Sequence, residues 1–120
     1  MKIRIRANSV RFRLTKSEVE AFCKNGYIEN VTEFGKKKFT YAIRADNKVD
    51  QLNADFDGNT ITMYVNQNKS SDWATNEKIG FECTVETNAK CKLSLLLEKD
   101  FVCMDETVED QSDNYPNPKA

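Results

Sequence analysis

Two stretches near the start of the chain alternate strictly between apolar and polar residues. They are Lys-Ile-Arg-Ile-Arg at positions 2–6 and Val-Arg-Phe-Arg-Leu at positions 10–14. Alternation with a period of two is typical of strands with one buried face, so we expect a hairpin with its turn at residues 7–9. The apolar side chains would then face the core. The outer face of this hairpin would carry Lys2, Arg4, Arg6, Arg11 and Arg13.

A capping box follows the second predicted strand. Thr15 can accept a hydrogen bond from the backbone of Glu18, whose carboxylate can accept one from the backbone of Thr15. We therefore expect a helix from Lys16 to Lys24. Its buried side would hold Val19, Phe22 and Cys23 at the spacing i, i+3 and i+4, and Asn25-Gly26 can supply a left-handed ending.

The pattern then returns to a period of two, which predicts strands over residues 27–34, 39–45, 79–85 and 91–98. Between them, Asp57-Gly58 is typical of a two-residue hairpin loop that pairs Ala54 with Ile61. Leucine occupies positions 95–97, so the last strand is apolar on both faces and we expect it inside a sheet. Trp73 lies in a polar connection and is expected to anchor that connection against the core.

These elements predict an α+β fold. We expect a mainly antiparallel, strongly curled or barrel-like β-sheet of six to eight strands, with one short helix in the N-terminal half; the pattern does not distinguish a barrel from a sandwich. A chain of 120 residues suits one core. Residues 1–102 are therefore assigned to a single domain. Residues 103–120 form an acidic segment that contains both prolines and is either part of that domain or a tail.

Composition indicates a globular protein of the cytoplasm. Hydrophobic residues make up 39% of the chain and charged residues 31%, which suits neither a disordered nor a membrane protein. We find no signal-peptide core and no apolar stretch that could span a membrane, so we expect the four cysteines to be thiols. The formal net charge of -1 argues against nucleic acid as a partner.

The absence of histidine restricts the chemistry of this chain. It excludes catalytic triads built on imidazole and zinc sites with histidine ligands. The four cysteines do not form the close pairs typical of structural zinc, and no glycine-rich phosphate loop occurs. We therefore assign no catalytic residue.

The acidic segment contains the only cluster of residues that suggests a metal. Carboxylates are the ligands that Mg²⁺, Mn²⁺ and Ca²⁺ prefer. The segment could be a solvated tail, could dock on the basic strands, or could bind such an ion or a partner; we expect no other cofactor. The candidate metal ligands are Asp105, Glu106, Glu109, Asp110 and Asp113.

The basic outer face of the first hairpin also allows two interpretations: it is solvated or paired within the chain, or it binds an anion. We favour a small binding or interaction module that uses this face, the acidic segment or both. Its partner would be a protein or a small anionic ligand. The alternative is a metal-dependent enzyme in which the acidic residues hold the ion and the arginines hold a phosphate-containing substrate.

Both ends of the chain resemble an uncharacterised family of short bacterial proteins of unknown function. The resemblance rests on KIRIR at positions 2–6, on NSVRFRLTKSEV at positions 8–19 and on the stretch from residue 97 to residue 118, in which EDQSDNYPNP is distinctive. It covers most of the chain. It implies a bacterial cytoplasmic protein and supplies no activity, cofactor or site residue.

Overall fold

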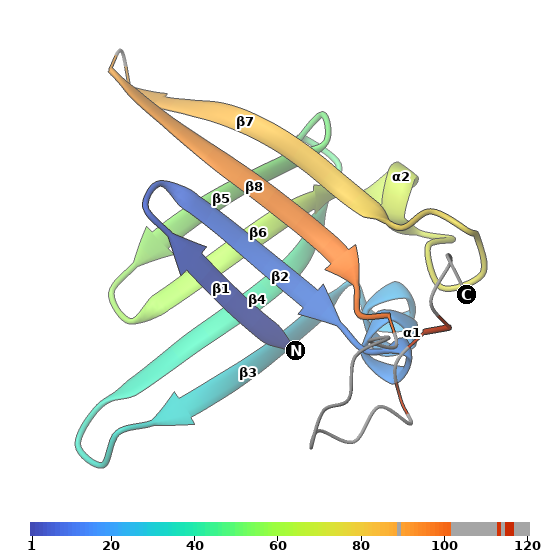
Figure 1. Ribbon diagram of the computed structural model, residues 1–120, viewed down its shortest axis with the longest axis horizontal. Coiled ribbons are helices and arrows are strands. Elements are labelled where there is room, and N and C mark those ends of the chain that lie inside the picture. Colours follow the sequence, from blue (N-terminus) through green and yellow to red (C-terminus); the bar gives the residue numbers. More distant parts are fainter. Residues whose placement is uncertain (89, 102–112, 114, 117–120) are drawn as a thin grey trace.

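The computed structural model describes residues 1–88, 90–101, 113, 115 and 116 (Figure 1). Strands predominate in this part of the chain. Its elements are β1 (Lys2–Arg6), β2 (Ser9–Leu14), α1 (Lys16–Asn25), β3 (Tyr27–Glu33), β4 (Lys38–Asp46), β5 (Leu52–Asp57), β6 (Thr60–Asn66), α2 (Gln67–Ser70), β7 (Gly80–Asn88) and β8 (Cys91–Lys99).

The strands form two four-stranded sheets. Sheet A has the order β1-β2-β8-β7, and sheet B has the order β3-β4-β6-β5. In each sheet two antiparallel hairpins meet at a central parallel pair, β2 with β8 and β4 with β6. The predicted strongly curled or barrel-like sheet is therefore wrong, because among the described strands each sheet ends in two edge strands and does not close. The mainly antiparallel pairing and the short helix after the first hairpin are confirmed.

The inner faces of the two sheets pack on each other and form the core. Phe12 of β2 contacts Tyr41 of β4 edge to face, with their ring centroids 6.1 Å apart. Figure 1 shows sheet A lying across sheet B, with α1 at one end of the pair. The buried core takes residues from both sheets and from α1: Val10, Phe12, Leu14, Val19, Phe22, Ile43, Leu52, Met63, Val65, Trp73, Phe81, Leu95 and Leu97.

Helix α1 begins at the predicted residue, Lys16, and has the predicted type of C-terminal ending. Glu18 Oε1 accepts a hydrogen bond from the backbone N–H of Thr15 at 2.8 Å, which is one half of the capping box. Val19 and Phe22 are buried on the side that faces the sheets. At the other end Gly26 has a φ of 72°, and its N–H donates to the carbonyl of Phe22 at 2.7 Å. The left-handed ending is therefore confirmed, with the helix one residue longer than expected.

The β5–β6 hairpin differs from its predicted register by two residues. Its loop is Gly58-Asn59 instead of Asp57-Gly58, so Ala54 pairs with Met63 and not with Ile61. A two-residue loop that starts with glycine is typical of a type II′ turn, and Gly58 has a φ of 57°. Since side chains repeat their face every two residues, the shift leaves the same residues on the inner face.

Two predictions about the second half of the chain are confirmed. Trp73 is fully buried, and its Nε1 donates to the carbonyl of Lys78 at 2.8 Å, which holds the connection before β7 against the core. Strand β8, which contains the leucines at positions 95–97, lies inside sheet A between β2 and β7. In the part of the chain that the structure describes, no helix has the length and apolar character needed to cross a membrane.

Candidate functional site

The outer side of the β1–β2 hairpin gathers the basic residues of the N-terminal segment. Strand pairing sets Lys2 opposite Arg13 and Arg4 opposite Arg11, while Arg6 lies opposite Ser9. Residues directly opposite each other project from the same side of a sheet. Their apolar neighbours on these strands belong to the core side, where Phe12 is fully buried. We call the surface formed by Lys2, Arg4, Arg6, Arg11 and Arg13 the basic face.

A carboxylate of β8 partly neutralises the basic face. Strand β8 runs parallel to β2 and sets Glu98 beside Arg13. The Oε1 atom of Glu98 accepts a hydrogen bond from Arg13 Nε at 2.6 Å and lies 3.8 Å from Arg11 Nε. The sequence gives no sign of this contact, because 85 positions separate the two residues and only the parallel pairing brings them together.

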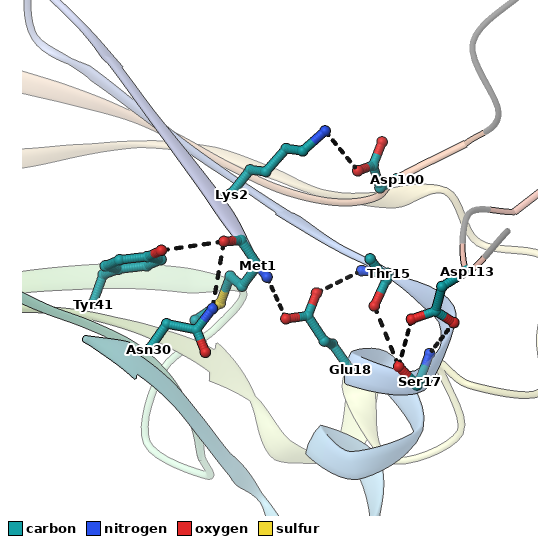
Figure 2. A network of polar contacts seen from close by, with 9 residues as sticks. All are labelled: Met1, Lys2, Thr15, Ser17, Glu18, Asn30, Tyr41, Asp100 and Asp113. Carbon is teal, nitrogen blue, oxygen red and sulfur yellow. Dashed lines mark hydrogen bonds and ion pairs between the residues drawn. The ribbon is translucent and has the colours of Figure 1, made fainter. Parts of the chain in front are cut away.

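A second carboxylate meets the basic face at its edge. Asp100 Oδ2 lies 3.5 Å from Lys2 Nζ (Figure 2). Asp100 is largely buried, and its backbone N–H donates to the carbonyl of Leu14 at 2.8 Å. Within the described residues, Arg4 and Arg6 form no ion pair. The carboxylates of Glu98 and Asp100 therefore leave the middle and far end of the basic face positively charged.

The basic face contains a shallow hollow of about 330 Å³. It is lined by four of the five cations, Lys2, Arg4, Arg11 and Arg13, together with Ile3. Guanidinium groups present planar pairs of N–H donors that match the oxygens of a carboxylate or a phosphate. The hollow therefore has the size and the donors to hold a small anionic group.

Of the predicted metal ligands, the structure describes only Asp113. Its Oδ1 accepts from the backbone N–H of Ser17 at 3.2 Å and its Oδ2 from the Ser17 hydroxyl at 2.6 Å (Figure 2). These hydrogen bonds from Ser17, followed by one from Thr15, lower the pKa of Asp113. Asp113 therefore caps the start of α1.

Four further metal candidates, Asp105, Glu106, Glu109 and Asp110, lie outside the described residues. Among the residues that are described, no group of three or more acidic or cysteine side chains is arranged to hold a metal ion. The metal site and the enzyme built on it remain predictions.

The described part of the C-terminal segment contacts α1 and the end of β8. The carbonyl of Asp113 accepts from the backbone of Lys16 at 2.9 Å, and the N–H of Tyr115 donates to the carbonyl of Asp100 at 2.8 Å. Figure 2 shows Asp113 at the start of α1. The described residues of this segment therefore dock on the first turn of the helix and on Asp100, which contacts Lys2 of the basic face.

Sequence reasoning also missed a buried lysine next to this docking point. Lys99 is only 4% exposed, and its Nζ donates to the carbonyl of Asn76 at 2.8 Å. The same Nζ lies 5.8 Å from the ring centroid of Trp73 and 5.0 Å from that of Tyr115. Burial lowers the pKa of Lys99 and raises the pKa of Tyr115 to about 12. Strict alternation along β8 would have placed Lys99 on the inner side with Leu95 and Leu97.

Comparison with known proteins gives a family but no activity. A family model described as "Family of unknown function (DUF7009)" matches residues 1–119. No curated protein and no solved structure matches the chain.

Proposed function

We propose that this chain, which belongs to the Family of unknown function (DUF7009), is a binding module that holds an anionic group of its ligand on the basic face. The observation that carries this proposal is the pairing of like charges across two strands. Lys2 faces Arg13 and Arg4 faces Arg11 around a hollow of about 330 Å³. Four cations with a concave surface between them are a ready-made site for an anion.

The electrostatics of the hairpin support an anionic ligand. Like charges directly opposite each other on neighbouring strands destabilise a sheet. Glu98 offsets this repulsion for Arg13, at 2.6 Å, and more weakly for Arg11, at 3.8 Å. Arg4 has no such carboxylate within the described residues. An anion that bound between Arg4 and Arg11 would remove the remaining repulsion and make charge-assisted hydrogen bonds.

The chemistry of the site favours phosphate or carboxylate groups over larger polyanions. Arginine recognises both groups through paired hydrogen bonds, and the hollow is small. The net charge of -1 disfavours long nucleic acids, which need a more extended basic surface. We place the module in the bacterial cytoplasm, an assignment that the family resemblance supports and with which the free thiols of Cys23, Cys83 and Cys91 agree.

Titration with pyrophosphate tests the proposal. A ligand at 100 times its Kd stabilises a protein by about 2.7 kcal/mol, which for a chain of 120 residues raises Tm by roughly 10 °C. We expect pyrophosphate to raise Tm more than chloride at equal ionic strength. Isothermal titration calorimetry gives Kd, and we expect Kd to increase with salt because the contact is electrostatic.

Two arginine variants locate the site. Arg4→Ala should weaken pyrophosphate binding by about tenfold or more, since loss of one charge-assisted contact is worth at least about 1.4 kcal/mol. Arg44→Ala is the matched control, because Arg44 is an exposed arginine of sheet B that stacks on Tyr27. Its Kd should equal that of the wild type. Pyrophosphate binding that is equally strong in Arg4→Ala would place the site elsewhere and refute the proposal.

A third variant tests the role of Glu98. Glu98→Gln removes the carboxylate that competes with the ligand for Arg11 and Arg13. We expect this variant to be less stable without ligand and to bind pyrophosphate more tightly. Weaker binding in Glu98→Gln would show that Arg11 and Arg13 do not contact the ligand.

A further inference from the structure

Two edge strands of the molecule carry complementary patterns of side chains. Strand β1 ends sheet A and β5 ends sheet B, so among the described strands each has one partner and one open side (Figure 1). Strand β1 reads Lys-Ile-Arg-Ile-Arg, and β5 reads Leu-Asn-Ala-Asp-Phe-Asp. Both alternate between apolar and polar residues, but the charged residues of β1 are basic and those of β5 are acidic.

The backbone of both strands presents hydrogen-bonding groups to the open side. Each strand leads into a two-residue hairpin loop. From such a loop, residues that bond to the partner strand alternate with residues whose N–H and C=O point away from it. The residues that point away are Ile3 and Ile5 on β1, and Ala54 and Phe56 on β5. The N–H of Ala54 donates to the side chain of its own neighbour, Asn53, at 2.8 Å, a local hydrogen bond that a neighbouring strand could replace.

A large apolar side chain is exposed on the inner side of each of these strands. Ile5 is 55% exposed, whereas Val10, directly opposite on β2, is 8% exposed. Phe56 is 68% exposed, whereas Ile61, directly opposite on β6, is partly buried. The edge residue is the more exposed of each pair because it has a neighbouring strand on one side only. Covering such apolar surface is favourable, and one more strand on each edge would cover it.

Antiparallel pairing of β1 with β5 of a second copy would match both patterns over the full length of β1. We infer that the two strands bind in this way and join sheet A of one copy to sheet B of the next. On the outer side of the joined sheet, two basic residues of β1 lie opposite the two acidic residues of β5, and on the inner side apolar residues meet. The five pairs, with the residue of β1 first, are Lys2 with Asp57, Ile3 with Phe56, Arg4 with Asp55, Ile5 with Ala54 and Arg6 with Asn53.

Hydrogen bonding and charge both favour this register. In a hydrogen-bonded antiparallel pair, the two residues direct their N–H and C=O groups at each other, as Ile5 and Ala54 do here. Opposite charges that face each other across two strands stabilise the pair, whereas like charges destabilise it. The same rule opposes pairing of β1 with β1 of another copy, because basic residues would then face basic residues. The charges therefore direct β1 to an acidic edge strand.

The other two edge strands of the described sheets match β1 less well. On β3, the inner row begins with Ile28, which packs against the core, but continues with the polar residues Asn30 and Thr32. On β7, the carbonyl of Glu82 already accepts a hydrogen bond from Gln51 Nε2 at 2.7 Å, so part of that edge is occupied. In the part of the chain that the structure describes, β5 is the edge strand that combines carboxylates, an open backbone and an exposed apolar side chain on its inner side.

Sedimentation equilibrium of the full chain tests this inference. Because β1 and β5 are different surfaces, copies can add head to tail. The weight-average mass of the wild-type protein should therefore rise with concentration between about 1 µM and 1 mM, the range of weak contacts. Added salt should lower the mass at a given concentration, because it screens the charges that face each other across the two strands.

Variants of both strands locate the contact. Phe56→Ser and Asp55→Arg should each weaken association by at least about tenfold, and Arg4→Asp should do the same. The double variant Arg4→Asp with Asp55→Arg exchanges the two charges and should restore association. Phe34→Ser and Asp50→Arg are the matched controls, because both residues are exposed and lie outside β1 and β5. Circular dichroism checks that each variant is folded.

Three results would overturn the inference. The first is a wild-type protein that stays monomeric up to about 1 mM. The second is association that Phe56→Ser leaves unchanged, and the third is a folded double variant that associates no better than Arg4→Asp alone. The inference goes beyond the function proposed above, and Asp55 and Phe56 do not line the hollow of the basic face. Pyrophosphate should therefore bind Asp55→Arg as it binds the wild type, so a failure of one proposal is distinguishable from a failure of the other.

Discussion

Replacing Phe12 with alanine removes an aromatic ring that packs between the two sheets. Phe12 is fully buried on β2 and meets Tyr41 of the opposite sheet at a centroid distance of 6.1 Å. Truncating a buried phenylalanine to alanine costs about 3–5 kcal/mol, from lost transfer free energy and from the cavity left behind. A domain of this size is stable by roughly 5–15 kcal/mol, so this one change removes a large share of its stability.

The cost can be converted into a melting temperature. Unfolding entropy near 60 °C is about 2.1 cal/mol/K per residue, or roughly 0.25 kcal/mol/K for 120 residues. A loss of about 3–5 kcal/mol should therefore lower Tm by roughly 12–20 °C. Urea unfolding measures the loss at constant temperature, and an unchanged m value shows that both proteins expose the same surface on unfolding.

The control is the same substitution at an exposed position. Phe34, in the turn between β3 and β4, is 70% exposed, and Phe34→Ala should change stability by less than about 0.5 kcal/mol. A double-mutant cycle of Phe12→Leu with Tyr41→Leu should show a coupling of about 0.5–1.5 kcal/mol for the aromatic pair. A cost below about 1 kcal/mol for Phe12→Ala, far under the range for buried aromatics, would refute a core packed between the two sheets at this point.

Two further predictions concern the backbone of sheet A and the start of α1. Gly80→Ala should destabilise by about 1–3 kcal/mol or more in urea unfolding, because a Cβ at Gly80 would lie 2.8 Å from the Cα of Glu98 on the paired strand. Asp113→Asn should lower Tm at neutral pH, and the difference from wild type should shrink as the pH falls below about 4. The reason is that hydrogen bonds from Ser17 depress the pKa of Asp113 below its ordinary 3.8. The ionised carboxylate therefore stabilises the fold above that pH, and this effect is lost when the carboxylate is protonated. Asp50→Asn, at an exposed position in a loop, is the control, and a difference for Asp113→Asn that is the same at all pH values would contradict this role.

The sequence predicted one part of the candidate site and missed the other. Strict alternation at positions 2–6 and 10–14 indicated a hairpin with its cations on one side, and the register of Arg4 opposite Arg11 agrees with it. The carboxylates that partner those cations were missed. Glu98 and Asp100 come from the far end of the chain, and nothing local to either residue indicates which strand lies next to it.

The error in the β5–β6 hairpin has a similar origin on a smaller scale. Asp57-Gly58 and Gly58-Asn59 both suit a two-residue loop, and the two registers bury the same set of side chains. The pattern of apolar residues therefore fixed the face that each strand turns to the core. It could not choose between registers that differ by two residues.

Local interactions explain what could be predicted from the chain alone. Side-chain alternation, the capping box at Thr15 and the glycine at position 26 act over a few residues, so the elements of secondary structure and the buried face of each could be derived from the sequence. The division into two sheets depends on parallel contacts between β2 and β8 and between β4 and β6. Strands β2 and β8 are distant in sequence, and β5 lies between β4 and β6 along the chain. The packing of the whole core selects these two contacts from many alternatives of similar local energy. Only the tertiary structure therefore decided that the described strands form two separate sheets and that Glu98 meets Arg13.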